Sequence, residues 1–202
     1  MKKIMIILLA LTMNLFVMAG GYKIGDTARD FSLKNIDGKM VSMKDMKNAE
    51  GFIVVFTCNH CPFAKAYEQR IIDLDKKYKS KNYPVIAINP NDASIVPEDS
   101  YDNMVKNAAE KDFTFPYVYD ESQEIAAAYG ATRTPHVFVL QKKNDKLVVS
   151  YIGAIDNNTD DAEKADKKYV EEAVDALIAK KNVTTAETKA IGCGIKWKKA
   201  IE

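Results

Sequence analysis

The sequence predicts a single α/β domain, with a central mixed β-sheet flanked by helices. Three observations lead to this fold class. Residues 52–57 and 84–89 are apolar runs rich in β-branched side chains, typical of strands buried on both faces of a sheet. Between them, apolar residues recur at three- and four-residue steps from Pro62 onward, which indicates an amphipathic helix. Strand, helix and strand, followed by helix, strand, strand and helix, is the order of an α/β protein.

Each remaining element has its own local signal. Extended pieces within residues 22–48, with a turn at Asp37-Gly38, predict an N-terminal hairpin. Pro62 suits the first position of the long helix, because an N–H at that position would have no partner within the helix. Further along, the pattern predicts a helix at 98–111, a short strand at 117–119, a helix at 122–129 capped by Gly130, strands at 137–140 and 147–151, and a helix at 160–180.

The last of these helices has both a predicted apolar face and predicted ion pairs. The face is expected at Val170, Val174, Leu177 and Ile178. The helix-spaced ion pairs are Asp160 with Lys164 and Glu163 with Lys167. The polar run 156–161 lacks the glycine and the distal glutamate of a calcium-binding loop, so we expect a turn and an N-cap there and no metal.

The charge balance bears on the class of partner. The chain of 202 residues carries 29 basic and 28 acidic side chains, a formal net charge of +1, and the basic residues are scattered. This distribution does not provide the clustered basic surface that nucleic-acid recognition needs. Nucleic acid is therefore not expected as a partner.

The first residues have the pattern of an export signal. Lys2 and Lys3 precede an apolar run over residues 4–17, and small residues at Val17 and Ala19 suit signal peptidase. We therefore predict a signal peptide at 1–19, a domain at 20–183 and a C-terminal tail at 184–202, with the mature protein periplasmic or secreted. An uncleaved signal anchor is the alternative, and it is the single route by which we expect a membrane attachment.

The pattern Cys58-Asn59-His60-Cys61 is the strongest functional signal. It lies between the buried strand and the helix that begins at Pro62. Two thiols at this spacing can form a disulfide, and the N-terminal end of a helix favours the thiolate, which is the reactive form. With Cys193, the chain has three cysteines, too few for a disulfide-stapled scaffold. Redox chemistry in an oxidising compartment is the prediction.

Two local features give the chain a resemblance to a known superfamily. One is the cysteine pair after a buried strand, and the other is Thr134-Pro135 directly before the strand that starts at His136. With the opening segment 25–33, they resemble the thioredoxin-like redoxins (AhpC/TSA-like). The sequences Thr-Cys-Asn-His-Cys-Pro at 57–62 and Gly-Cys-Gly-Ile-Lys-Trp at 192–197 are most similar to exported, peroxiredoxin-like members of the thioredoxin family.

This resemblance implies the thioredoxin fold, with Pro135 as a cis-proline that faces the dithiol and helps to present a bound chain. It also leaves two activities open. Thioredoxins usually have Trp before the first cysteine, where this chain has Thr57. Peroxiredoxins usually have Thr at the position of Cys58, and their attacking cysteine is often followed by proline, as Cys61 is here.

The site residues are assigned the following roles. Cys58, expected to be the more exposed thiol, attacks as thiolate, Cys61 resolves the mixed disulfide, and His60 stabilises the thiolate. Thr134 and Pro135 complete the predicted site. The possible accessory residues are Thr57, Arg133, His136 and Cys193.

Three accessory residues have alternative roles. Arg133 could stabilise a thiolate or polarise a peroxide, or it could be a surface charge. His136 could lie at the edge of the site or point into the sheet. Cys193 could be a third redox centre, or a structural residue in a docked tail anchored by Ile195 and Trp197.

The leading functional hypothesis is an exported thiol–disulfide oxidoreductase. Its substrates would be protein thiols and disulfides, supplied by a redox partner protein that the sequence does not identify, and no cofactor is expected. The alternative is a thiol peroxidase that reduces peroxides through Cys61 or Cys58. A minor alternative is a copper(I) carrier that uses Cys58 and Cys61 as soft ligands, with His60 or His136 as further donors.

Overall fold

The computed structural model describes residues 20–198. The predicted signal peptide at 1–19 lies outside these residues, as does the end of the predicted C-terminal tail. None of the helices within 20–198 is both long and apolar enough to cross a membrane.

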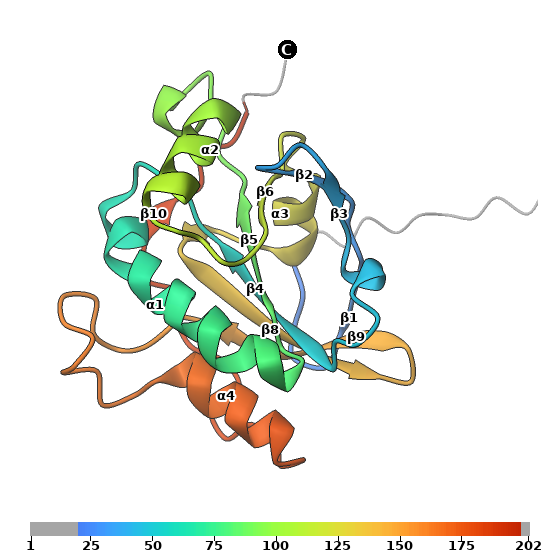
Figure 1. Ribbon diagram of the computed structural model, residues 1–202. Helices are drawn as coiled ribbons and strands as arrows, with labels where there is room; N and C mark the ends of the chain where they lie inside the picture. Colours follow the sequence, from blue (N-terminus) through green and yellow to red (C-terminus); the bar gives the residue numbers. More distant parts are fainter. Residues whose placement is uncertain (1–19, 199–202) are drawn as a thin grey trace, which may run out of the picture.

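A mixed sheet of eight strands forms the centre of the described residues (Figure 1). Its strands, in spatial order, are β1 (Thr27–Ala28), β9 (Lys146–Gly153), β8 (His136–Lys143), β4 (Gly51–Phe56), β5 (Val85–Asn89), β6 (Tyr117–Tyr119), β2 (Leu33–Asn35) and β3 (Met40–Val41). Strand β4 pairs parallel with β5 and antiparallel with β8. Every residue of β4 and β5 is buried, as the two apolar runs predict.

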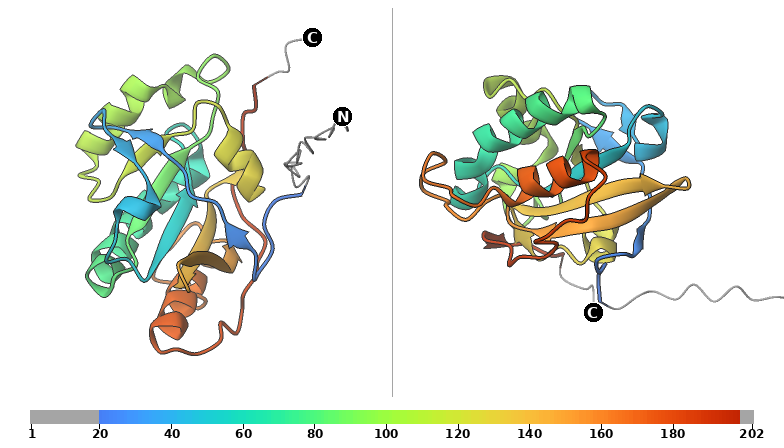
Figure 2. Two further views of the ribbon diagram at one scale, coloured as in Figure 1. Left: turned by 90° about the vertical axis from the view of Figure 1, so that its right-hand side faces the viewer. Right: turned by 90° about the horizontal axis from the view of Figure 1, so that it is seen from below.

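Helices cover both faces of this sheet. On one face, α1 (Pro62–Tyr78) and α4 (Tyr169–Ile178) pack against alternate residues of β4, β5 and β8. On the other face, α3 (Glu124–Tyr129) packs against the remaining apolar residues of the same strands. Figure 2 shows α1 and α4 on one side of the β8–β9 hairpin. A further helix, α2 (Tyr101–Glu110), lies beside β6 and contributes Met104 and Ala108 to the apolar core on the α1 and α4 face of the sheet. The predicted α/β fold is therefore confirmed.

The predicted N-terminal hairpin is present, and the strands predicted at 137–140 and 147–151 pair as a second one. The turn between β2 and β3 contains Gly38, whose positive φ of 80° is the reason that glycine suits this position. The turn between β8 and β9 places Asn144 and Asp145 in the left-handed region, at φ 48° and 60°. Both residue types tolerate that conformation, and the two strands extend further than predicted.

The helix predicted at 98–111 begins later than expected. Residues Pro97–Asp99 form one 3-10 turn, Ser100 is extended, and α2 starts at Tyr101. The interruption turns the carboxylate of Asp99 inward, where it accepts hydrogen bonds from the backbone N–H groups of Asn59 and His60.

The helix predicted at 160–180 is wrong over its first half, because α4 starts at Tyr169. Residues 156–168 form a loop around Arg70 of α1, whose guanidinium binds the Asp156 carboxylate and the carbonyl of Thr159. Lys164 pairs with Asp161 at 3.0 Å and not with Asp160. At the far end of α4, Ile178 is 40% exposed and does not belong to the buried face.

The C-terminal segment returns to the sheet. Around residues 186–188 it hydrogen-bonds to Ile152 at the end of β9. It then forms β10 (Cys193–Gly194), which pairs antiparallel with the two-residue strand β7 (Arg133–Thr134). This pairing brings residues separated by about sixty positions in sequence to the N-terminal end of α1.

Candidate redox site

The cysteine pair occupies the connection between β4 and α1. Strand β4 ends at Phe56, Thr57 donates its N–H to Ile88 at 2.9 Å, and Cys61 is the N-cap residue of α1. Cys58 is 2% exposed and Cys61 is fully buried. Cys58 is thus the more exposed of the two thiols only by a small margin, because the docked C-terminal segment contributes a third cysteine to the same cluster.

Two polar side chains fix the backbone between the cysteines. The Asn59 side chain donates to the carbonyl of Glu98 at 2.9 Å and accepts from the hydroxyl of Tyr117 at 2.9 Å. Asp99 is fully buried, and its Oδ1 accepts the N–H groups of Asn59 and His60 at 2.7 and 3.0 Å. These hydrogen bonds involve no sulfur atom, so they can hold the loop in place whichever disulfide is formed.

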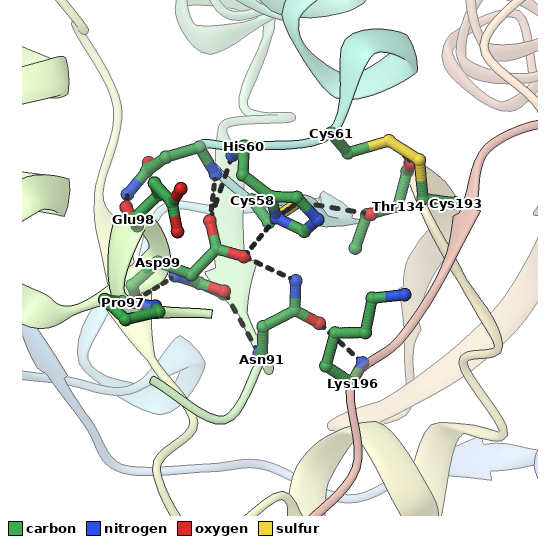
Figure 3. A network of polar contacts seen from close by, with 12 residues as sticks. Cys58, His60, Cys61, Asn91, Pro97, Glu98, Asp99, Thr134, Cys193 and Lys196 are labelled. Atoms are coloured by element: carbon green, nitrogen blue, oxygen red, sulfur yellow. Dashed lines mark hydrogen bonds and ion pairs between the residues drawn. A yellow bond between two sulfur atoms is a disulfide. The ribbon is translucent and has the colours of Figure 1, made fainter. Parts of the chain in front are cut away.

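Cys61 is bonded to Cys193 (Figure 3). The predicted disulfide partner of Cys61 was Cys58, which is free and buried in this structure. The physical reason is the β7–β10 pairing, which places Cys193 opposite Thr134 and beside the N-terminal end of α1. The disulfide brings Cys193 into the site, and it is compatible with both roles considered for this residue, a third redox centre or a structural residue of the docked tail.

The environment of Cys58 keeps it protonated. Its Sγ lies 3.3 Å from the Thr134 hydroxyl and 3.6 Å from Nδ1 of His60. Burial raises the pKa of the Cys58 thiol to about 11, with a further contribution from the Asp99 carboxylate, while hydrogen bonds from Thr134 and from the backbone of Cys61 and His60 act in the opposite direction. With Cys61 bonded to Cys193, burial therefore favours the neutral thiol of Cys58, and the thiolate expected for the reduced protein stays a prediction.

His60 is oriented by Asp99. Its Nδ1 lies 2.5 Å from Oδ2 of Asp99, and that oxygen also accepts from the side chain of Asn91 at 2.7 Å. Asn91 in turn accepts the backbone N–H of Lys196 at 2.9 Å. Figure 3 shows this chain of contacts, which links the cysteine loop to the C-terminal segment.

Thr134 and Pro135 lie beside the sulfur atoms. Both residues are buried, the peptide bond between them is cis, and the carbonyl oxygen of Thr134 is 3.3 Å from Sγ of Cys61. Thr134 thus contacts Cys58 through its hydroxyl and Cys61 through its carbonyl. The structure brings both residues to the predicted site.

The accessory residues divide into those near the tail and those in the sheet. Arg133 is exposed and donates to the carbonyl of Gly192 at 3.0 Å, so its contact is with the tail and not with a sulfur. His136 accepts the N–H of Thr132, lies against Phe138, and is held neutral, since burial lowers its pKa to about 4. The sheet-facing alternative for His136 is the one that the structure supports.

Three other expectations concern neighbouring side chains. Thr57 is 5% exposed, with its backbone bonded to β5. Ile195 is 7% exposed and anchors the tail as expected. Trp197 is 40% exposed, so its predicted role as an anchor is wrong.

Asp99 and Asn91 are the site residues that sequence patterns missed. A usable signal was present, because β4 and β5 are parallel neighbours and the residues after such strands meet at one edge of a sheet. Cys58 follows β4 and Asn91 follows β5. Asp99 could not be found in this way, since it lies in a segment predicted to be helical.

Cys58, His60 and Asp99 place three possible metal donors within 4.8 Å of one another. The soft pair of the predicted copper(I) site is not assembled in this form, because Cys61 is bonded to Cys193 and His136 faces the sheet. The same three side chains instead meet at one atom, Nδ1 of His60, which lies 3.6 Å from Sγ of Cys58 and 2.5 Å from Oδ2 of Asp99.

Comparison with known proteins identifies the family. A family model described as the AhpC/TSA family matches residues 24–149, more than half of the chain. The chain belongs to the AhpC/TSA family. A curated relative, the thiol-disulfide oxidoreductase ResA of Oceanobacillus iheyensis, is 28% identical over 138 residues, which cover 66% of this chain and 67% of the relative.

Solved structures agree with this family assignment. An uncharacterized conserved protein from Geobacillus kaustophilus is 37% identical, with a TM-score of 0.80 over 87% of this chain and 93% of that one. A hypothetical protein from Sinorhizobium meliloti 1021 is 29% identical, with a TM-score of 0.81 over 89% and 97% of the two chains. More distant thioredoxin-like structures share the fold. The predicted superfamily and thioredoxin-like fold are confirmed, and the names of the curated relatives support the predicted class of oxidoreductase.

Proposed function

We propose that this protein is an exported thiol–disulfide oxidoreductase that exchanges disulfides with protein partners. One observation carries the proposal. Cys61 is bonded to a cysteine on an extended strand, and a third thiol, Cys58, lies in the same cluster. An oxidoreductase caught in a mixed disulfide with a substrate needs the same parts: a bridging sulfur, a strand that carries the other sulfur, and a thiol that can resolve the bond.

This arrangement favours roles opposite to those that the cysteine spacing suggests. Cys61 is the sulfur that bonds to the strand, and Cys58 is the sulfur that releases it. The Cys58 thiolate attacks Sγ of Cys61, the Cys58–Cys61 bond forms, and the bond from Cys61 to the strand breaks. The electron pair leaves on the sulfur of the strand, which becomes a thiolate. The strand is thereby reduced and the protein is oxidised to the Cys58–Cys61 disulfide that the sequence predicts.

The reverse sequence of steps oxidises a partner dithiol. A partner thiolate attacks Sγ of Cys61 in the Cys58–Cys61 disulfide, and the electron pair leaves on Cys58. The second partner thiol then attacks the first as thiolate, forming the partner's disulfide and releasing the thiolate of Cys61. Two electrons pass from the partner to the protein, and no cofactor is required.

Neighbouring groups have separate tasks in these steps. The Thr134 hydroxyl and the backbone N–H groups of His60 and Cys61 stabilise the Cys58 thiolate when it forms. The helix N-terminus at Cys61 favours the thiolate of that residue when it is released. Pro135, by the family resemblance, helps to hold the backbone of the bound strand.

Export rests on the N-terminal pattern at residues 1–19, followed by a mature protein in the periplasm or outside the cell. An oxidising compartment suits a protein whose working parts are disulfides. Intact mass of the protein recovered from the exported fraction would test this, with a mature chain starting at Gly20 as the expected result and a full-length chain as the contrary one.

The enzymatic proposal is tested by following disulfide exchange with a protein substrate. The reduced protein should cleave the disulfides of insulin at a rate that exceeds that of glutathione at equal thiol concentration. Cys61→Ser should abolish this activity. Cys58→Ser combined with Cys193→Ser, which removes both thiols that can release a partner from Cys61, should accumulate a covalent protein–insulin adduct. Activity that survives in Cys61→Ser would overturn the assignment.

The peroxidase alternative is decided in parallel. The fully reduced protein is mixed with hydrogen peroxide, and oxidation is followed by intact mass. We expect a rate close to that of an ordinary thiol. A rate orders of magnitude higher, with a sulfenic acid trapped at Cys61, would make the protein a peroxidase instead.

A further inference from the structure

The tail is held at the site mainly through backbone atoms. Cys193 pairs with Thr134 and Gly194 with Arg133, and the N–H of Ile195 donates to the carbonyl of Thr132. The backbone N–H of Lys196 donates to the side chain of Asn91, and its carbonyl accepts from the side chain of Gln123. Such contacts recognise an extended strand without reading most of its side chains.

Two glycines flank Cys193, and they differ in the space that a side chain would have. A Cβ atom at Gly192 would lie 2.3 Å from the carbonyl oxygen of Thr134 and 2.9 Å from the nitrogen of Pro135. These are backbone atoms of the site, so they cannot swing aside as a flexible side chain could. A Cβ atom at Gly194 would meet nothing within 4 Å. Glycine is therefore required before the cysteine and not after it.

The residue that follows Gly194, Ile195, is distinguished by its burial. Ile195 is 7% exposed and joins the apolar cluster on the α3 face of the sheet. Trp197, two residues further, is 40% exposed. The tail thus presents three features to the site: a glycine, a cysteine, and an aliphatic side chain two positions beyond the cysteine.

Any strand that forms a disulfide with Cys61 in the same register as the tail meets the same three requirements. Cys61 is fully buried beneath the tail, and β7 provides the edge along which the tail approaches it. A partner cysteine that replaces Cys193 on this edge places its preceding residue against the Thr134 carbonyl, and its second following residue takes the buried position of Ile195 in the apolar cluster.

We infer that the site selects partner segments of the pattern Gly-Cys-x-aliphatic in an extended conformation, and that its own tail occupies the site as an internal competitor. This inference rests on the proposed function and specifies its substrate class. The tail must leave β7 before a partner strand can pair there, and the attack of Cys58 on Cys61 breaks the covalent bond that holds it.

The test uses a protein with one remaining cysteine, Cys58→Ser combined with Cys193→Ser, so that Cys61 alone can react. The probes are synthetic peptides with the sequence of residues 190–196, whose cysteine is activated as a 2-thiopyridyl disulfide. The thiolate of Cys61 attacks the peptide sulfur, forming the Cys61–peptide disulfide, and the electron pair leaves with pyridine-2-thione, whose absorbance is followed. Rates are divided by those of the same peptides with glutathione, which removes differences in intrinsic reactivity.

Three peptides form a matched set: the native sequence, the peptide with alanine in place of Gly192, and the peptide with alanine in place of Gly194. We expect the Gly192 replacement to lower the normalised rate at least tenfold, and the Gly194 replacement to change it less than twofold. The serine-substituted tail competes equally against all three peptides.

Two other outcomes have separate meanings. Equal normalised rates for the three peptides, well above one, would overturn the inferred pattern and leave disulfide exchange through Cys61 intact. Rates for all three no faster than with glutathione would also overturn the inferred pattern, and the insulin assay then decides separately whether Cys61 exchanges disulfides at all.

A second measurement uses the tail itself in the full chain. After oxidation, peptide mapping should show the Cys61–Cys193 disulfide at least tenfold less abundant, relative to Cys58–Cys61, in Gly192→Ala than in Gly194→Ala. Equal ratios in the two variants would contradict the steric role of the Thr134 carbonyl.

Discussion

The loop at 57–61 and the tail segment at 191–198 meet at one disulfide, but they are held in different ways. The loop is mostly buried. Its backbone N–H groups donate hydrogen bonds to Asp99, and its Asn59 side chain accepts one from the hydroxyl of Tyr117. The tail is only partly buried, and noncovalent contacts at β7, Asn91 and Gln123 hold it together with the single side chain of Ile195.

This difference separates a fixed half of the site from an exchangeable half. Groups that must keep their geometry through a redox cycle, such as Cys58 and His60, lie on the fixed half. The half that can be replaced by another chain is attached mainly by backbone hydrogen bonds, which another extended strand with a glycine before its cysteine can also form. Asn91 connects the two, because its side chain contacts Asp99 on one side and Lys196 on the other.

The largest effect is expected from removing the anchor of the fixed half. Asp99→Ala leaves the N–H groups of Asn59 and His60 without their buried acceptor, and should lower the free energy of unfolding by about 3 kcal/mol or more. Urea denaturation measures this change. Asp102→Ala, at an exposed position on α2, is the control and should cost less than about 1 kcal/mol. A similar midpoint for both variants would mean that Asp99 does not anchor the loop.

A second effect concerns the reactivity of Cys58 in the oxidised protein. Because burial raises its pKa to about 11, the neutral thiol dominates below that pH, and the thiolate fraction grows about tenfold per pH unit between 7 and 10. Alkylation by iodoacetamide, followed by mass, should rise by the same factor. Glutathione is the control, and its rate levels off near pH 9. A plateau at that pH for Cys58 would show that its thiol has an ordinary pKa.

Substitutions in the tail, the exchangeable half of the site, should have unequal effects on how stably it docks. Ile195→Ala removes the buried anchor and should destabilise the docked tail by about 2 kcal/mol. Trp197→Ala changes an exposed side chain and should cost less than about 0.5 kcal/mol. Hydrogen exchange of residues 192–196 reports both changes. An equal loss of protection in the two variants would contradict the assignment of Ile195 as the anchor.

The smallest effect is expected at His60. Nδ1 of His60 lies 3.6 Å from Sγ of Cys58 and faces the thiolate when it forms. His60→Ala should therefore lower the reduction potential of the Cys58–Cys61 pair, by about 20 mV, a small change because the same nitrogen is paired with Asp99. Redox equilibration of the Cys193→Ser protein measures it, and His60→Lys, which keeps the charge, is the control. An unchanged potential in His60→Ala would remove the residue from the mechanism.

Much of the fold could be predicted from the sequence, and the errors have local causes. The buried strands β4 and β5 and the helix from Pro62 were predicted to within a residue at most of their ends, because their patterns are long and uniform. The start of α4 was misplaced, since helix-spaced charges at 160–167 form weaker interactions than the contacts of Arg70 with the same segment.

The sequence by itself determined the family, the three cysteines, the placement of two of them at the start of α1, and the neighbourhood of Thr134 and Pro135. Those features are local, and adjacent residues encode them. Only the tertiary structure decided which cysteine Cys61 bonds to, how deeply Cys58 is buried, and which carboxylate faces His60. These depend on β10 pairing with β7 and on Asp99 turning inward from a distant segment, and long-range pairing leaves no periodic pattern in the chain from which it could be predicted.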